Sequence, residues 1–217
     1  MASYIQIKRI EKMKKLLLSI ALLGGVVLTS QAQTDKGDVI LGGNVSFNTI
    51  KTDASGANSS YDLSIVPNVG YFVDDNIAIG TGIGYQTSRL DEASELGKTE
   101  AFVIAPFGRY YAPISNNFKF FGQLSVPMAF GTVKAIDDNL DTGDKTGSST
   151  SIGVALSPGF AYFPSSKVGL EFAINGLSYN NYSVEDGDGN SIKGAGHDSF
   201  SFGADFFAPS LGIHFYF

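Results

Sequence analysis

The chain has 217 residues, a formal net charge of −6, and neither cysteine nor tryptophan. With 43% hydrophobic and 17% charged residues, it is too apolar for a disordered protein. The absence of cysteine excludes a disulfide framework and a cysteine-based metal or redox site. The negative charge argues against nucleic acid as a partner, and the length suits one domain.

Residues 1–32 have the pattern of a secretory signal peptide. A basic region is followed by an apolar run over 16–28 and by small residues up to Ala32. The run has 13 residues, fewer than the ~20 that a helix needs to cross a bilayer. Met13 and the two lysines after it are typical of a natural start, which would make 1–12 an upstream extension. We therefore predict export of a single domain spanning 33–217.

From residue 38 onward, apolar and polar residues alternate with a period of two, which is typical of strands with one apolar face. In the segment 61–71, for example, every odd position is apolar. The alternation predicts eight strands, in chain order at residues 38–50, 61–71, 77–86, 101–112, 123–130, 152–162, 168–174 and 211–217.

The connections between these strands alternate in length. Short ones are expected at 73–76, 113–117 and 164–167. Long ones, which hold most of the charged residues, are expected at about 51–60, 88–99, 133–148 and 183–198. This rhythm indicates an all-β, antiparallel, up-and-down transmembrane barrel, because Greek-key crossovers in a sandwich would not sort the connections so regularly.

The composition of the two strand faces indicates which one meets lipid. A water-facing surface is about 25–35% charged. Here the non-apolar face is mostly Gly, Ser, Ala, Asn and Gln, with few charges in mid-strand: Asp62, Arg109, Lys119 and Glu171. That face suits a crowded lumen, so we expect the apolar face to contact the membrane.

Aromatic residues gather at the strand ends in two groups, as interfacial girdles do, although aromatics are common in any strand. One group lies near the short turns and the C-terminus and comprises Tyr71, Phe72, Tyr110, Tyr111, Phe118, Phe120, Tyr162, Phe163, Phe215 and Phe217. The other lies near the long connections and comprises Phe47, Tyr61, Tyr85, Phe102 and Phe130.

Three features resemble the small eight-stranded outer-membrane β-barrels of the OmpA and OmpX type from Gram-negative bacteria. They are the block 106–111 with the turn and strand that follow it, the closing strand 211–217, and the leader. The resemblance implies that Phe217, with Phe215, forms the terminal signal read by the barrel-assembly machinery. The chain ends at its last strand, so we expect no peptidoglycan-binding domain and no wall-tethering role.

The resemblance implies a location in the outer membrane, with the bilayer and lipopolysaccharide as partners, and we expect a monomer. Eight strands leave a lumen only wide enough for side chains to fill, so a wide pore is not expected. A non-enzymatic structural or surface-interaction role is therefore favoured. A narrow OmpW-like channel for small or hydrophobic solutes is the alternative.

The mid-strand charges form a candidate lumen cluster. Arg109, Lys119 and Glu171 lie close to short turns, in the non-apolar phase of their strands. Since the period of two points them inward, we expect Arg109 to pair with Glu171, with Lys119 nearby, as a polar plug. The alternative is that each charge is separately hydrated near the mouth of the barrel.

Other polar motifs give weaker signals. The triplet 197–199 (His-Asp-Ser) is similar to the motif of outer-membrane lipid A deacylases, but its surroundings do not match them, so a hydrolase is a remote alternative. His214 is expected to face the lumen. The acidic segments 137–141 and 186–190 have alternating oxygen ligands but lack the Gly and Glu of a calcium loop. We predict no catalytic residue, metal or cofactor.

Overall fold

The computed structural model describes residues 34–51, 59–92, 95–136, 142–203 and 210–217. The predicted signal peptide lies outside these residues. The strands are β1 (Val39–Lys51), β2 (Ser59–Asp74), β3 (Ile77–Glu92), β4 (Glu95–Ser115), β5 (Phe118–Ser125), β6 (Met128–Ile136), β7 (Thr142–Ser165), β8 (Val168–Ala173), β9 (Leu177–Asp186), β10 (His197–Phe202) and β11 (Ser210–Tyr216). In this part of the chain, no helix is long and apolar enough to span a membrane.

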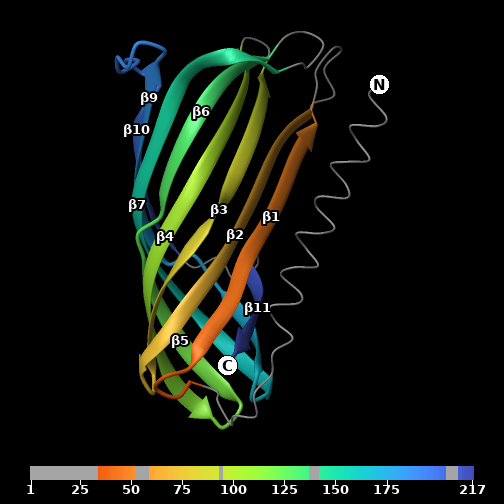
Figure 1. The fold of residues 1–217 in the computed structure, drawn as a ribbon, viewed down its shortest axis with the longest axis vertical. Coiled ribbons are helices and arrows are strands. Elements are labelled where there is room, and N and C mark those ends of the chain that lie inside the picture. Colours follow the sequence, from red (N-terminus) through yellow and green to blue (C-terminus); the bar gives the residue numbers. More distant parts are fainter. Residues whose placement is uncertain (1–33, 52–58, 93–94, 137–141, 204–209) are drawn as a thin grey trace.

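These segments form a closed antiparallel barrel of eight strands, as predicted (Figure 1). Three of the eight strands are interrupted. β5 and β6 both lie between β4 and β7 and form one barrel strand that breaks at Val126 and Pro127. In the same way, β8 continues into β9, and β10 and β11 belong to the last barrel strand.

Backbone hydrogen bonds bridge the first two interruptions. At the break between β5 and β6, Pro127 has no N–H to donate, but its carbonyl accepts a hydrogen bond from the N–H of Gly153 at 2.9 Å. The N–H of Val126 donates to the carbonyl of Pro106, also at 2.9 Å. Beside the gap between β8 and β9, Ile174 donates to Pro158 at 3.0 Å. The interrupted strands therefore remain attached to their neighbours.

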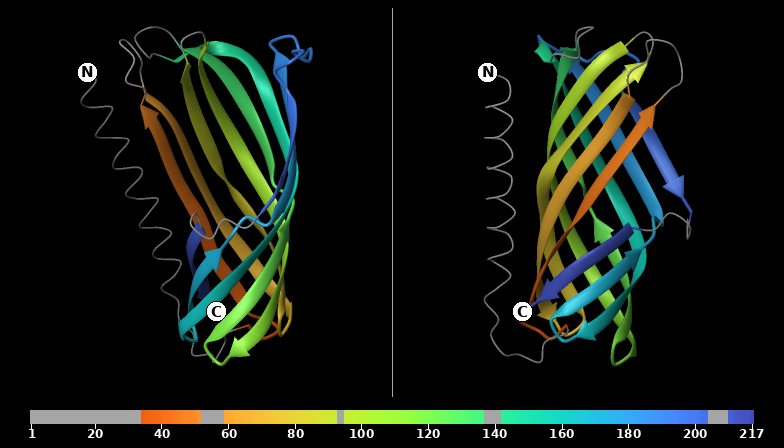
Figure 2. Two further views of the ribbon diagram at one scale, coloured as in Figure 1. Left: turned by 180° about the vertical axis from the view of Figure 1, so that it is seen from behind. Right: turned by 90° about the vertical axis from the view of Figure 1, so that its right-hand side faces the viewer.

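The barrel closes where β1 meets β11. Ile40 pairs with Tyr216 and Leu41 with Phe215, and Val39 and Phe217 exchange backbone hydrogen bonds of 2.8 and 3.0 Å. Within the described residues, no pairing of β1 with β11 or β10 extends beyond Leu41. Figure 2 shows β1 diverging from β9 and β10 away from the end of the barrel where the chain terminates.

The two ends of the barrel differ as the connection lengths predict. Tight turns join β2 to β3, β4 to β5 and β7 to β8 at one end, here called the turn end. The opposite end, called the loop end, is where the chain passes from β1 to β2, from β3 to β4, from β6 to β7 and from β9 to β10 (Figure 1). The long connections predicted at 88–99 and 133–148 are wrong, however. β3 and β4 remain paired up to Glu92 and Glu95. β6 and β7 remain paired up to Ile136 and Thr142.

A third long connection, predicted at 183–198, is also shorter than expected, since β9 reaches Asp186 and β10 begins at His197. The common cause is that the apolar alternation stops before the backbone pairing does. Where both faces of a strand meet water, neither face needs to be apolar, so the period-two signal disappears although the ladder continues.

The alternation of side chains matches the prediction over most of the barrel. Apolar residues of alternate positions cover the outer surface, among them Ile65, Ile79 and Leu156, which are 45–52% exposed. One part of the aromatic prediction is wrong. Phe72, Tyr111 and Phe163 are fully buried in the lumen because each directly follows an outward-facing tyrosine, and neighbouring strand residues point to opposite faces.

These inward aromatics form the core of the barrel at the turn end. They pack with Phe121 and Tyr216 in a cluster with ring centroids 5.1–6.3 Å apart. The lumen is therefore aromatic at the turn end and lined by small polar residues nearer the loop end.

Candidate functional site in the barrel lumen

Arg109 and Glu171 meet inside the barrel, just above the aromatic core. They come from β4 and β8, and their side chains are 6% and 5% exposed. Nη1 of Arg109 donates to both carboxylate oxygens of Glu171, at 2.7 and 2.8 Å. The two predicted lumen charges thus form a direct ion pair shielded from water.

Polar side chains occupy the remaining donors and acceptors of this pair. Arg109 donates from Nε and Nη2 to Oε1 of Gln123 at 2.9 and 2.6 Å, and from Nη1 to the hydroxyl of Tyr111 at 2.8 Å. Tyr216 donates its hydroxyl proton to Glu171 at 2.9 Å. A buried ion pair needs such additional hydrogen bonds to offset its desolvation.

The contribution of Tyr111, Gln123 and Tyr216 was not identified from the sequence. Tyr111 was assigned to the interfacial girdle, whereas the structure places its hydroxyl 3.0 Å from that of Tyr216 across the lumen. The available signal was the phase of the strand, since Tyr111, Gln123 and Tyr216 share the inward phase with Arg109, Lys119 and His214 respectively.

Lys119 is buried on the inner face, as its strand phase predicts, and shares a register row with Glu171 through Ala161, but its bonding partner is one that the sequence does not indicate. Its ammonium group donates to the hydroxyl of Thr34 and lies 5.8 Å from the ring centroid of Phe163. The ion pairs of the described residues do not link it to Glu171. Thr34 precedes the first strand and is 2% exposed, so this segment reaches into the turn end of the barrel.

The segment before β1 is fixed across the turn end by backbone contacts. Gly37 donates to the carbonyl of Phe72 at 2.9 Å, and Lys36 donates its backbone N–H to the carboxylate of Asp75 at 3.2 Å. The turn end is therefore covered by this segment, by Lys119 and by the aromatic core.

His214 faces the lumen, as predicted, and lies beside the ion pair. Its Nδ1 is 3.2 Å from Oε2 of Glu171, but the orientation is unsuitable for a hydrogen bond, and neither ring nitrogen has a hydrogen-bond partner within the described residues. The ring lies against Gly42 of β1, where any Cβ would overlap it. Glycine at this position makes room for the histidine.

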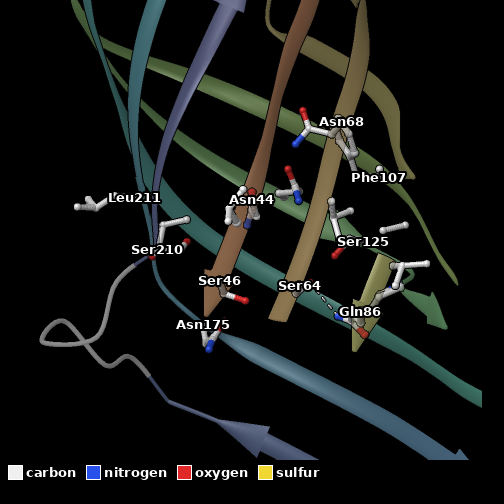
Figure 3. A pocket seen from close by; sticks show the side chains of 18 residues that line it. Asn44, Ser46, Ser64, Asn68, Gln86, Phe107, Ser125, Asn175, Ser210 and Leu211 are labelled. Carbon is white, nitrogen blue, oxygen red and sulfur yellow. Dashed lines mark hydrogen bonds between the residues drawn. The ribbon is translucent and has the colours of Figure 1, made fainter. Parts of the chain in front are cut away.

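A polar cavity of about 580 Å³ lies on the loop-end side of this cluster (Figure 3). Its wall includes the uncharged polar side chains of Asn44, Ser46, Ser64, Asn68, Gln86 and Ser125. Gln86 donates to the hydroxyl of Ser64 at 3.2 Å. A second cavity of about 510 Å³ shares Ser46, Ser64 and Gln86 with the first and also contacts Asp62.

The larger cavity also reaches the outer surface of the barrel. Its lining includes Val45 of β1 and Leu211 of β11, whose side chains are 75% and 78% exposed. Each of these two residues lies four residues beyond the last pair of β1 with β11, Leu41 with Phe215. The lumen is thus accessible from the side at this height.

The geometry of 197–199 gives little support to the hydrolase alternative. His197 packs against Tyr182, with ring centroids 5.3 Å apart. Asp198 points to the other face of β10, where its carboxylate accepts hydrogen bonds from Asn181 at 2.7 Å and Tyr179 at 3.2 Å. The hydrolase alternative pairs His197 with the hydroxyl of Ser199, which lies two residues later on the same face of β10. Asp198, on the opposite face, is not placed to orient the histidine as the acid of a nucleophilic triad does.

The acidic segment 186–190 is organised by hydrogen bonds within itself. In the segment 186–190, the Asp186 carboxylate accepts backbone hydrogen bonds from Asp188 at 3.0 Å and Asn190 at 2.9 Å, and these bonds lower the pKa of Asp186. The segment 137–141 lies outside the described residues. Within those residues, no group of three or more His, Cys, Asp and Glu side chains could hold a metal ion.

The terminal aromatics lie where the sheet closes. Phe215 is 44% exposed on the outer face and pairs with Leu41, while the backbone of Phe217 completes the last contact with Val39. The terminal residue therefore contributes to closure, and its assembly role remains a prediction.

Three solved structures are similar to this chain at low sequence identity. The N-terminal barrel of OprF from Pseudomonas aeruginosa has 11% identity and a TM-score of 0.37, covering 84% of this chain and 98% of its own. Neisserial surface protein A has 13% identity and a TM-score of 0.44, covering 83% and 97%. OprG from Pseudomonas aeruginosa has 13% identity and a TM-score of 0.47, covering 87% and 99%.

The comparison with curated proteins gave no match. The family model of the outer membrane protein β-barrel domain, in contrast, matches residues 18–206, which is most of the chain. The chain therefore belongs to this family of bacterial outer-membrane β-barrel proteins.

Proposed function

We propose that the protein is a non-enzymatic outer-membrane barrel with a structural or surface-interaction role, and that its lumen does not conduct. The observation that carries this proposal is the closed turn end, where the buried pair of Arg109 and Glu171, bonded directly at 2.7 Å, lies above an aromatic core. An ion moving through the barrel would have to displace both the pair and the rings beneath it. The loop end then serves as the surface that meets partners outside the cell.

Conductance in planar bilayers tests this proposal. We expect the reconstituted protein to show no sustained current steps, because the cluster and the aromatic core close the turn end. The variant Arg109→Ala with Glu171→Ala should also remain silent or show only brief openings, since the rings of Phe72, Tyr111 and Phe163 still cover the turn end. Sustained ion-selective steps from the unmodified protein would overturn the proposal.

A narrow channel is the second candidate, and the side opening favours it. The cavity that contains Asn44 and Ser64 extends between Val45 and Leu211 to the apolar outer surface. A small hydrophobic solute could enter from the loop end and leave through this opening without crossing the closed turn end. A bifunctional thiol reagent that links Asn44→Cys to Gly212→Cys would test this route, because a cross-link across the opening should abolish uptake of such a solute by proteoliposomes. Unchanged uptake by the cross-linked protein would exclude the route.

A further inference from the structure

Four basic residues occupy one register row across β3, β4, β6 and β7, which lie side by side in Figure 1. Arg89 pairs with Lys98, Lys98 with Lys134, and Lys134 with Lys145. Directly paired residues project from the same face of a sheet. Neighbouring strands lie ~4.8 Å apart, so the row extends over about 15 Å. We refer to these four residues as the basic row.

The basic row lies on the outer surface, beyond a ring of exposed aromatics. Tyr85, Phe102 and Phe130 pair across β3, β4 and β6 and are 44–49% exposed. The cations on these three strands lie four residues from the aromatic side chains, toward the loop end. Aromatic rings of this kind mark the boundary between hydrocarbon and headgroups. The basic row is therefore at the level of the outer headgroups.

Two of the lysines are held together by one carboxylate. Glu100 accepts from Nζ of Lys98 at 2.6 Å and from Nζ of Lys134 at 2.7 Å. An ammonium group has three donors, so each lysine can bind a further acceptor while it contacts Glu100. The shared carboxylate thus positions two positive charges next to each other.

Arg89, at the end of the row, is also held in place. Its Nη2 donates to the carbonyl of Ser59 at 2.7 Å, and its guanidinium lies 5.0 Å from the ring centroid of Tyr61. Its Nε–H has no hydrogen-bond partner within the described residues. The row and Glu100 together carry a net charge of +3, on a chain whose overall charge is −6.

We propose that the basic row binds the phosphate groups of a phosphorylated lipid of the outer leaflet, of the lipid A class. The charge is complementary, the height matches that of a headgroup, and the cations are spread over several strands as an extended diphosphorylated headgroup requires. Cations bind phosphate through charge-assisted hydrogen bonds. The inference rests on the outer-membrane location of the family and is independent of the closed lumen.

Binding of diphosphoryl lipid A to the folded protein in a neutral detergent tests this site. The test variant combines Lys98→Gln, Lys134→Gln and Lys145→Gln. The control variant loses the same amount of charge outside the basic row and combines Lys36→Gln, Lys167→Gln and Lys193→Gln. We expect the first variant to bind about 10- to 100-fold more weakly, because each cation near an anionic surface contributes to affinity. The control should bind as the unmodified protein does.

Two further probes distinguish the source of the phosphate. Lipid A without its phosphates should bind the unmodified protein at least about tenfold more weakly than diphosphoryl lipid A. Inorganic phosphate alone should not bind at millimolar concentration. Equal affinity of the two triple variants, or of the two forms of lipid A, would overturn the proposal. So would tight binding of inorganic phosphate, which would indicate a site for a free anion.

Glu100 provides a test in the opposite direction. Because Glu100 lowers the positive charge of the site by one, Glu100→Gln should bind diphosphoryl lipid A several-fold more tightly and retain heat-modifiable migration as a sign of folding. Weaker binding by a folded Glu100→Gln variant would contradict the proposed arrangement.

Discussion

Arg109 and Glu171 depend on each other because both are almost completely shielded from water. Removing one partner leaves the other charge buried and uncompensated, which costs about 3–5 kcal/mol. Glu171→Ala should therefore lower the free energy of unfolding by about that amount, measured in urea with the protein in lipid vesicles. Glu185→Ala, an exposed acid on β9, is the control and should cost less than about 1 kcal/mol.

The double variant shows whether the two effects share one cause. If the pair is direct, Arg109→Ala and Glu171→Ala together should cost clearly less than the sum of the single changes, because the second substitution removes a charge that the first has already stranded. Additive effects would mean that each charge is hydrated separately, as the alternative interpretation of the sequence states.

Gly42 should accept a side chain only if His214 is removed. A Cβ at Gly42 would overlap the imidazole, so Gly42→Val should destabilise the barrel by about 1–3 kcal/mol, as overpacking does. Combining it with His214→Ala should restore part of that loss. Gly108→Val is the matched control, because no atom lies within 4 Å of the Cβ position there. Equal losses for Gly42→Val and Gly108→Val would contradict this packing.

The lumen pair illustrates what can be predicted from single residues. Arg109 and Glu171 were predicted to meet because their phase in the strands and their distance from short turns place them on one face at one height. Lys119 satisfied the same criteria, yet it bonds Thr34. Thr34 lies outside the strands, so its position does not follow from strand phase, and the partner of Lys119 could not be predicted.

At the scale of elements, strand β11 closes the barrel through few contacts. Only Ile40 and Leu41 of β1 pair with it within the described residues, with Val39 and Phe217 bonded beside them. Deleting Phe217 removes the hydrogen bonds with Val39 and the terminal aromatic. We expect a severalfold lower yield of heat-modifiable barrel in the outer membrane, measured by electrophoresis of unheated samples.

Tyr162→Ala is the control for this deletion, because it removes an outward-facing aromatic at the turn end without changing the closure. Its assembly yield should stay close to that of the unmodified protein. An undiminished yield after deletion of Phe217 would show that the terminal aromatic is dispensable for assembly.

Elements were predicted well where one face is apolar and less well where both faces are polar. The predicted strand 77–86 corresponds to β3, but β3 continues to Glu92. Residues 87–92 contain only one strongly apolar side chain, Leu90, so no alternation marks the extension. Backbone pairing continues through this part of the hairpin, and pairing leaves no signature in composition.

Across the whole molecule, the described residues form a barrel with a polar cavity toward the loop end and a closure at the turn end. The cavity lies beside Ser64, and the ion pair with the aromatic core provides the closure. This asymmetry was only partly predictable. The charges indicated a plug, but the inward aromatics that complete it were assigned to the outer surface.

The natural absence of cysteine allows a direct test of this asymmetry by single cysteine substitution. Three single-cysteine variants are each inserted into liposomes in one orientation. Ser64→Cys reports on the cavity, Asp188→Cys on the loop end and Asn116→Cys on the turn end. A small membrane-impermeant thiol reagent is added to one side at a time. Ser64→Cys should react only from the side on which Asp188→Cys reacts, and reaction from the side of Asn116→Cys would contradict a closed turn end.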